Sequence, residues 1–179
     1  PQALITAMAK AVAGNDRDAY LANHVFAGPE TRTMVTDFFV TIQTAQKYAN
    51  KCRRAFGDEA ADRYCGRTLR DVIVATNAED CEYVIDGDTA VVTHPIAEMN
   101  MVRIDGVWKM EYRDYDTPEE LERVRAQSRM YKATAAVYRQ LIAEMVEPGM
   151  TPEELNERKK AMMAGIYNPK PHIDAVANE

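Results

Sequence analysis

The sequence predicts an α+β protein in which long amphipathic helices cover a small curved antiparallel sheet. Apolar residues recur at helical spacing over two long segments, 29–56 and 118–147. Between them, the Asp-Gly pairs at 86–87 and 105–106 separate short runs rich in β-branched and aromatic residues, which is the pattern of β-hairpins. Helices therefore come first and last in the chain, with the strands between them.

The length and composition favour one domain. A chain of 179 residues with 46% hydrophobic residues can fill a single core without splitting. We expect this domain to cover residues 1–166, followed by an extended or mobile tail over 167–179. The expected helices cover residues 2–13, 17–25, 29–56, 58–65, 118–147 and 152–166. The expected strands cover residues about 69–75, 81–85, 89–94, 99–104 and 107–113.

Helix boundaries follow from capping residues. Pro29 suits the first position of a helix, where its missing amide would be unpaired in any case. Gly57 is a natural left-handed stop for the same helix. Two copies of Thr-Pro-Glu-Glu-Leu, beginning at Thr117 and Thr151, combine a threonine cap with a proline start and a capping-box glutamate. These signals predict the starts of the two C-terminal helices.

Each long helix carries an apolar stripe with alternating spacings of three and four residues. The first stripe consists of Val35, Phe38, Ile42, Ala45, Ala49, Cys52 and Phe56. The second consists of Leu121, Val124, Ser128, Tyr131, Ala135, Tyr138, Ile142 and Met145. Stripes of matching spacing can pack against each other within the chain, or against a second copy in a homodimer.

The last hairpin has a definite expected register. A two-residue turn at Asp105-Gly106 places Ile104 opposite Val107 and Arg103 opposite Trp108. The same register places Met101 opposite Met110 and Met99 opposite Tyr112, all on one largely apolar face. The register of the first hairpin stays open, because Ile-Asp-Gly-Asp-Thr fits either a two-residue turn or a longer bulged one.

Composition and missing motifs exclude several functions. The net charge of −6 and the pI near 5.2 argue against a nucleic-acid partner, which requires clustered Lys and Arg. No run approaches the roughly 18 apolar residues of a membrane span. The glycine-rich nucleotide motifs, the H-E-x-x-H zinc motif and the G-x-S-x-G elbow are missing, so we expect no cofactor. The sole serine, Ser128, lies within a helical stripe and is a poor candidate nucleophile.

Cysteines and histidines do not predict a metal site. Cys52, Cys65 and Cys81 lack paired C-x-x-C spacing; Cys52 and Cys65 could form a disulfide across the turn at Gly57, although three buried thiols are the simpler interpretation. The histidines lie far apart in the sequence, without a second ligand at helical or tight-turn spacing. We expect His24 and His172 at the surface. His94 ends a strand, where a solvated position is preferred over one facing a cavity.

One group of residues stands out as a candidate binding site. It lies on the apolar face of the strands and consists of Trp108, Tyr112, Arg103, Met101, Met110 and His94. Arg103 could stack over the Trp108 ring as a cation-π pair. If helices cover this face completely, the group is ordinary core, which is the simpler interpretation. If the sheet curves, the face becomes a pocket for an apolar molecule bearing a carboxylate. The carboxylates of Asp37, Asp71, Glu98 and Glu111 are expected to be solvated.

Short phrases in the sequence resemble the NTF2-like superfamily, cone-shaped α+β domains in which helices pack into a curved sheet. The phrases are Gly14-Asn-Asp-Arg-Asp-Ala-Tyr-Leu21, Ile85-Asp-Gly-Asp-Thr-Ala-Val-Val92 and Val102-Arg-Ile-Asp-Gly-Val-Trp-Lys-Met110. Together with the long middle helix, they are similar to uncharacterised exported bacterial proteins of planctomycete type, over about residues 2–115. The resemblance implies a cone-shaped fold and an exported, periplasmic or extracellular, location. The acid/base Asp and oxyanion-binding Tyr of ketosteroid isomerase-like members match no position here, so no catalytic residue is transferred.

The leading functional hypothesis is a non-catalytic accessory or small-ligand-binding domain. It rests on the missing catalytic motifs and on the apolar hairpin face. A cofactor-free NTF2-like isomerase or lyase, using the cone as its active site, is the alternative. A structural homodimerisation module, built on the two long stripes, is a further one.

Overall fold

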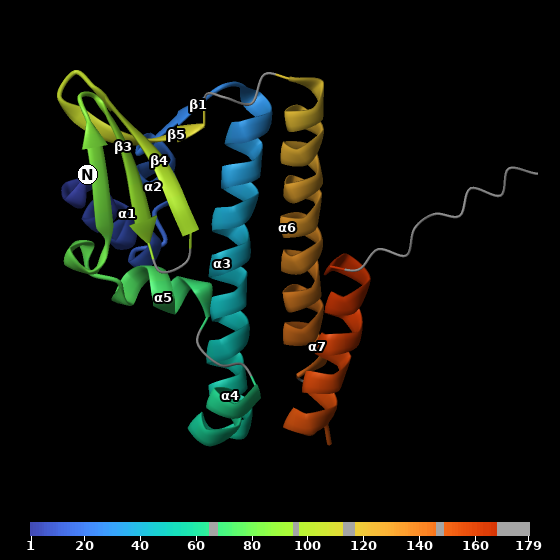
Figure 1. The fold of residues 1–179 in the computed structure, drawn as a ribbon. Helices are drawn as coiled ribbons and strands as arrows, with labels where there is room; N and C mark the ends of the chain where they lie inside the picture. Colours follow the sequence, from blue (N-terminus) through green and yellow to red (C-terminus); the bar gives the residue numbers. More distant parts are fainter. Residues whose placement is uncertain (65–67, 95–96, 113–116, 146–148, 168–179) are drawn as a thin grey trace, which may run out of the picture.

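The elements of the fold are taken from a computed structural model, which describes residues 1–64, 68–94, 97–112, 117–145 and 149–167. Within these ranges the chain forms seven α-helices and one five-stranded sheet, in an α+β arrangement (Figure 1). Of the expected tail, 167–179, Tyr167 is instead the last residue of a helix, and residues 168–179, including His172, lie outside the described residues.

The N-terminal helices pack against the sheet. Helix α1 (Gln2–Ala13) buries an apolar face that includes Leu4, Ile5 and Val12. Helix α2 (Arg17–Ala22) begins at Asp16, whose carboxylate accepts a hydrogen bond of 2.9 Å from the Ala19 amide. The expected second helix, 17–25, was therefore too long.

Strand β1 (His24–Phe26) replaces the last turn of that expected helix. It lies parallel to β5 (Val107–Tyr112), with His24 opposite Met110 and Phe26 opposite Tyr112. Pairing with a distant strand outweighs the local helical tendency here, because it satisfies the backbone amides of the segment. The sheet is consequently mixed, and the expectation of a purely antiparallel sheet was wrong.

The other strands are antiparallel, in the order β1-β5-β4-β3-β2, and the sheet is not closed. Strands β2 (Glu82–Asp86) and β3 (Thr89–His94) form the first hairpin, whose turn has two residues because Asp86 lies opposite Thr89. Strand β4 (Ala97–Ile104) pairs with β5 in the predicted register, with Met101 opposite Met110. The turn between them places Asp105 and Gly106 at positive φ, as an Asp-Gly hairpin requires.

The segment predicted as a strand over 69–75 is a helix, α5 (Leu69–Ala75). The Asp71 amide donates to Thr68 Oγ1 over 3.2 Å, and the Thr68 amide donates to Asp71 Oδ2 over 3.0 Å. This reciprocal capping box fixes the first turn of the helix and overrides the strand preference of the Val-Ile-Val run. A single 3-10 turn, Ala78–Asp80, then leads into β2.

The long helices α3 (Pro29–Phe56) and α6 (Pro118–Glu144) lie side by side and run in the same direction (Figure 1). Contacts along their length keep a nearly constant sequence separation: Thr41 Oγ1 donates to the Tyr131 carbonyl over 2.9 Å, and Lys51 Nζ donates to the Ile142 carbonyl over 2.9 Å. The two predicted stripes therefore pack against each other within the chain. Helix α6 ends at Glu144, with Met145 as its C-cap, and residues 146–147 of its expected range lie outside the described residues.

Two shorter helices pack at the far end of this pair. They are α4 (Asp58–Tyr64) and α7 (Pro152–Tyr167), close to the predicted bounds. Cys52 lies in the same region, buried, with its sulfur 3.7 Å from Met145 Sδ. Cys65 is outside the described residues, so the expected alternative of a Cys52–Cys65 disulfide stays a prediction.

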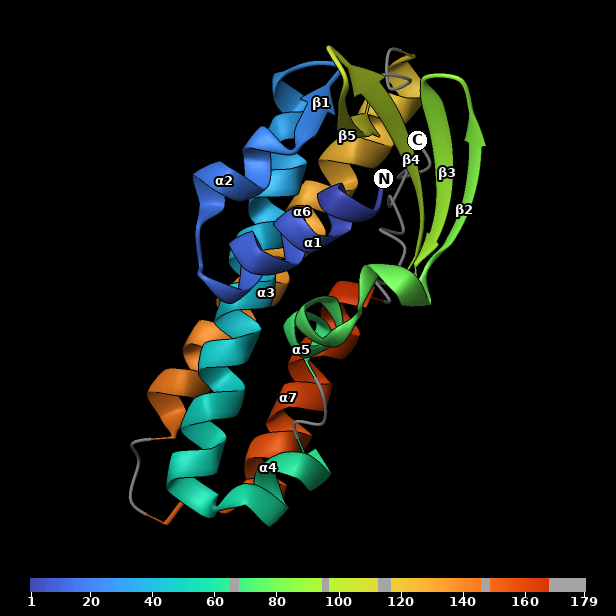
Figure 2. The same ribbon diagram turned by 90° about the vertical axis from the view of Figure 1, so that its left-hand side faces the viewer.

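The buried apolar residues form two clusters along the helix pair. Figure 2 shows the sheet toward one end of this pair and α4 and α7 toward the other. The first cluster lies between the sheet, α1, α2 and the N-terminal halves of α3 and α6, and contains Val12, Val92 and Met101. The second lies among α4, α7 and the C-terminal halves of α3 and α6, with Leu141 and Leu155 at its centre. None of the described helices combines the length and the apolar composition needed to cross a bilayer.

Candidate functional site

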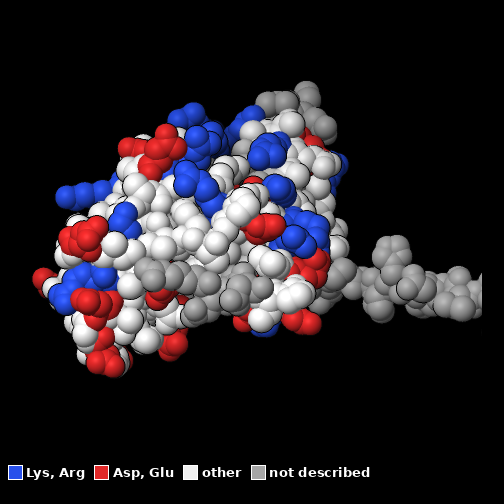
Figure 3. Space-filling model, turned by 90° about the horizontal axis from the view of Figure 1, so that it is seen from above, with Lys and Arg blue, Asp and Glu red and all other residues white. Residues whose placement is uncertain are grey.

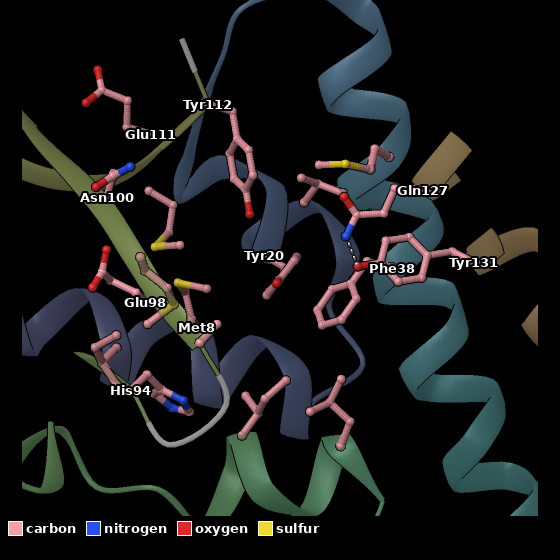
Figure 4. Close-up of a pocket in the computed structure, with 18 residues that line it drawn as sticks. Met8, Tyr20, Phe38, His94, Glu98, Asn100, Glu111, Tyr112, Gln127 and Tyr131 are labelled. Atoms are coloured by element: carbon pink, nitrogen blue, oxygen red, sulfur yellow. Dashed lines mark hydrogen bonds between the residues drawn. The ribbon is translucent and has the colours of Figure 1, made fainter. Parts of the chain in front are cut away.

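A cavity of about 400 Å³ lies beside the first cluster. It lies between the inner face of the sheet and helices α1, α3, α5 and α6 (Figure 4). Its wall is mainly aromatic, aliphatic and thioether: Ile5, Met8, Tyr20, Met34, Val35, Phe38, Leu69, Ile73, Met99, Met110, Tyr112 and Tyr131. A space of this size is within the usual range of small-molecule sites.

Three tyrosines from different elements contribute polar groups to this wall. Tyr20 comes from α2, Tyr112 from β5 and Tyr131 from α6. Burial raises the pKa of the Tyr20 phenol above its usual range, and the nearby Tyr112 and Tyr131 shift it in the same direction. Tyr20 therefore keeps its proton at neutral pH and can donate a hydrogen bond.

The side of the cavity formed by α6 is held by a hydrogen bond and an aromatic contact. Gln127 Nε2 donates to the Tyr131 hydroxyl over 2.9 Å (Figure 4). The Tyr131 ring meets the Phe38 ring edge to face, with centroids 5.3 Å apart. Through these contacts, Phe38 and Tyr131 together form one side of the cavity wall.

His94 lies at another end of the cavity, on the inner face of β3. Its side chain is buried, so the expectation of a solvated strand end was wrong. The reason is that His94 shares a face of β3 with the buried Ala90 and Val92, and helices cover this face. Burial lowers the pKa of His94, which favours the neutral imidazole at pH 7.

The acidic residues near the cavity do not form an acid/base pair inside it. Glu98, Asn100 and Glu111 line its edge, and their polar ends point away from the Tyr20 ring (Figure 4). Asp71 caps α5. Within the described residues, no group of three or more His, Cys, Asp and Glu side chains could hold a metal ion.

The structure brings three of the six candidate residues to the cavity: Met110, Tyr112 and His94. Met101 is fully buried in the core beside it. Arg103 stacks over Trp108 at 5.5 Å, as the sequence predicted, but its guanidinium also forms an ion pair of 2.6 Å with Asp88. Arg103 and Trp108 are not among the lining residues, so the cavity lacks the expected cationic anchor.

Sequence reasoning missed the helical contributors to the site. Tyr20, Phe38, Gln127 and Tyr131 come from α2, α3 and α6. Phe38 and Tyr131 belong to the predicted apolar stripes, so their burial could be expected, but their position beside the sheet depends on the tertiary fold. Tyr20 carried no local signal other than its place in the NTF2-like phrase.

Two polar residues outside the cavity are buried, contrary to expectation. His24 is only 6% exposed because it lies beneath the rings of Tyr20, Phe26 and Tyr112. Asp37 was expected to be solvated, yet its side chain is only 14% exposed. It accepts a short hydrogen bond from Ser128 and lies 3.5 Å from Lys132 Nζ, which explains why the sole serine lies in the helix seam.

Searches for similar proteins add no name to this site. No family model, no curated protein and no solved structure matches the chain.

Seen from above, acidic and basic side chains are interspersed over the molecule, with uncharged surface between them (Figure 3). The function is therefore argued from the cavity and its lining.

Proposed function

We propose that this chain is a non-catalytic binding domain for a small, largely apolar ligand. The observation that carries the proposal is the cavity of about 400 Å³ between the sheet and the helices, with its aromatic and thioether wall. Tyrosine rings provide large rigid contact area, and methionine side chains adapt to irregular shapes. The ligand occupies the space between Tyr20, Met99 and Tyr131.

The polar groups on the wall determine which ligands fit. The phenol of Tyr20 is a hydrogen-bond donor at neutral pH, and the neutral imidazole of His94 offers one donor or one acceptor. An apolar molecule with one carbonyl or hydroxyl group suits these partners. An anionic group would be disfavoured in this cavity, because its described lining residues include two carboxylates, Glu98 and Glu111, and no Lys or Arg.

The NTF2-like assignment and an exported accessory role remain part of this proposal. Support comes from the order of elements, with α1 and α2 preceding the hairpins and packing on the same face of the sheet that lines the cavity. We expect fractionation of the source cells to recover the protein outside the cytoplasm. Recovery with the cytoplasmic proteins would contradict the exported role and leave the binding proposal intact.

Titration with the neutral fluorescent probe N-phenyl-1-naphthylamine tests binding in the cavity. We expect a saturable rise in fluorescence with the wild-type protein. Met99→Trp fills the cavity from β4 and should weaken probe binding at least tenfold. Val84→Trp introduces the same side chain at a position that is 72% exposed, and should change binding less than twofold. A wild-type protein that gives no saturable signal with this probe would contradict the proposal.

A cofactor-free isomerase or lyase is a second candidate, and the position of His94 favours it. A buried, neutral imidazole in the same cavity as the Tyr112 phenol could accept a proton from a bound ketone. Exchange of ketone α-protons for deuterium, followed by NMR, tests this activity. Exchange that is catalysed by the wild type and lost in both His94→Gln and Tyr112→Phe would establish this candidate over simple binding.

A homodimer through the long helices is the third candidate from the sequence. The two stripes that suggested it contact each other within one chain, so a dimer would have to use other faces of α3 and α6. Sedimentation equilibrium at high protein concentration distinguishes a monomer from a homodimer. A monomer under these conditions would contradict the proposal that the chain is a dimerisation module.

A further inference from the structure

A second cavity, of about 220 Å³, lies next to the first one. It extends from there along α3 and α6 toward α7. It is enclosed by α3, α5, α6 and α7. The side chains of Phe38, Leu69 and Tyr131 line both cavities and form the partition between them. A single water molecule accounts for about 30 Å³, so the second space is large enough for a small organic molecule.

The charge in the second cavity differs from that in the first. Lys159, from α7, is the sole charged residue among those that line it. Within the described residues, Lys159 forms no ion pair with a carboxylate, whereas its neighbours Arg158 and Lys160 pair with Glu144 and Glu157. A partly buried ammonium group without a counter-ion is unfavourable, and an anion bound beside it would relieve that cost.

The described contacts of Lys159 leave it able to bind a ligand. Its ammonium group donates a short hydrogen bond to the Tyr64 carbonyl, at the C-terminal end of α4, and lies 5.7 Å from the centroid of the Tyr48 ring. The contact with Tyr64 is a helix-capping interaction and has a structural value of its own. An ammonium group has three donors, however, and the carbonyl uses only one of them.

The remaining lining suits the aromatic body of a ligand. The rings of Phe38, Tyr48, Tyr131 and Tyr138 all contribute to the wall, with Tyr48 and Tyr138 tilted against each other at 5.3 Å. Thr134 also lines the cavity, and its buried Oγ1 has no hydrogen-bond partner among the described residues. A buried hydroxyl without a hydrogen-bond partner lowers the stability of the folded protein, and a ligand oxygen could accept a hydrogen bond from it.

We propose that this second cavity binds a small aromatic monocarboxylate. The carboxylate pairs with the ammonium group of Lys159, and the ring lies among the tyrosines of α3 and α6. The site is separate from the first cavity, which takes the uncharged ligand. Lys159 gives this second cavity a cation, which is not found among the described residues that line the first.

Isothermal titration with benzoate, and with its neutral isostere benzamide, tests the charge requirement. We expect benzoate to bind the wild type more tightly than benzamide does. Lys159→Met keeps the length of the side chain and removes its charge, so it should weaken benzoate binding at least tenfold. Lys160→Met removes a charge from the neighbouring, exposed position and should have less than a twofold effect. Equal benzoate affinity in the wild type and Lys159→Met would overturn the proposal.

A second variant separates the ligand contact from the capping role of Lys159. Lys159→Arg retains the positive charge and should bind benzoate within about threefold of the wild type. Circular dichroism checks that both variants are folded. If Lys159→Arg loses benzoate binding as completely as Lys159→Met while both remain folded, a charge-based contact is excluded.

Competition between probes distinguishes this proposal from the function proposed for the first cavity. Benzoate should leave N-phenyl-1-naphthylamine binding unchanged, and Met99→Trp should bind benzoate normally. Displacement of the neutral probe by benzoate would place the anion in the first cavity and overturn the present proposal alone. Benzoate binding that depends on Lys159, without any binding of the neutral probe, would overturn the first proposal alone.

Discussion

His24 is a titratable residue whose burial works against its charged form. Its Nδ1 lies 2.8 Å from the Tyr20 carbonyl and therefore carries the proton. The other nitrogen, Nε2, is buried without a hydrogen-bond partner in the described residues. Burial lowers the pKa of His24 to about 4, and the charge of Lys109 acts in the same direction.

This shift predicts a loss of stability in acid. In the unfolded chain His24 binds a proton near its ordinary pKa of 6.5, whereas the folded protein resists protonation down to about 4. The free energy of unfolding therefore falls as the pH drops from about 6.5 to 4, by roughly 3 kcal/mol from this residue, and is constant with respect to it below that range.

Urea unfolding of wild-type and His24→Phe proteins at pH 7 and pH 4.5 checks this prediction. The phenylalanine preserves the ring contacts with Phe26 and Tyr112 but cannot titrate. We expect the difference in unfolding free energy between the two pH values to be about 2 kcal/mol smaller in the variant. His94 titrates in both proteins, so its contribution cancels. An unchanged difference would show that His24 is not protonated on unfolding.

At the scale of elements, the pairing of α3 with α6 includes a hydrogen bond between a buried hydroxyl and a carboxylate. Ser128 Oγ donates to Asp37 Oδ2, in addition to the bonds from Thr41 and Lys51 to carbonyls of α6. Ser128→Ala leaves the Asp37 carboxylate with one donor fewer, and we expect a loss of about 2 kcal/mol in the free energy of unfolding. Urea unfolding at pH 7 measures it.

Thr33→Ala is the matched control for this contact. Thr33 is an exposed residue of α3 whose hydroxyl, within the described part of the chain, bonds only to the Pro29 carbonyl of its own helix. Its loss should change the free energy of unfolding by about 0.5 kcal/mol or less. If both alanine variants lose the same amount, the Asp37 contact contributes nothing specific.

The elements that sequence reasoning predicted correctly are those specified by local signals. Asp105-Gly106 determined the last hairpin and its register, because a two-residue turn allows only one pairing. The starts of α3, α6 and α7 followed from proline and capping residues. The helix α5 carried a local signal too, in Thr68 and Asp71, but the apolar run after them dominated the interpretation.

The elements that could not be predicted depend on partners far away in the sequence. Strand β1 has only three residues and exists because β5 provides its hydrogen bonds. The first cavity likewise combines side chains of α1, α2, α3, α5, α6 and three strands, so no short pattern could identify it. His94 and Tyr112 were selected from their strand face, whereas Tyr20 and Tyr131 required the packed structure.

At the scale of the whole molecule, the two clusters share the helices α3 and α6. A loss of packing at one end should therefore destabilise the other end. Leu141 is fully buried in the second cluster, and Leu141→Ala should reduce the free energy of unfolding by about 3 kcal/mol. The sole tryptophan, Trp108, packs against the first cluster and reports on it by fluorescence, while far-UV circular dichroism reports mainly on the helices.

We expect the unfolding transitions followed by fluorescence and by circular dichroism to shift by the same amount in Leu141→Ala, as in a single cooperative transition. Gln140→Ala, at the adjacent exposed position, should leave both unchanged within about 0.5 kcal/mol. A shift in circular dichroism without a shift in Trp108 fluorescence would show instead that the two ends unfold independently.

The parallel direction of α3 and α6 affects how the chain is made in the cell. Two antiparallel helices joined by a short loop can pair as soon as the second helix is synthesised. Here Thr41 can contact Tyr131 only after a further 90 residues have been synthesised. At ordinary rates of translation this takes on the order of 5 to 20 seconds. During that interval the part of α3 that packs on α6 lacks its native partner, and we expect chaperones that bind nascent chains at the ribosome to recognise it.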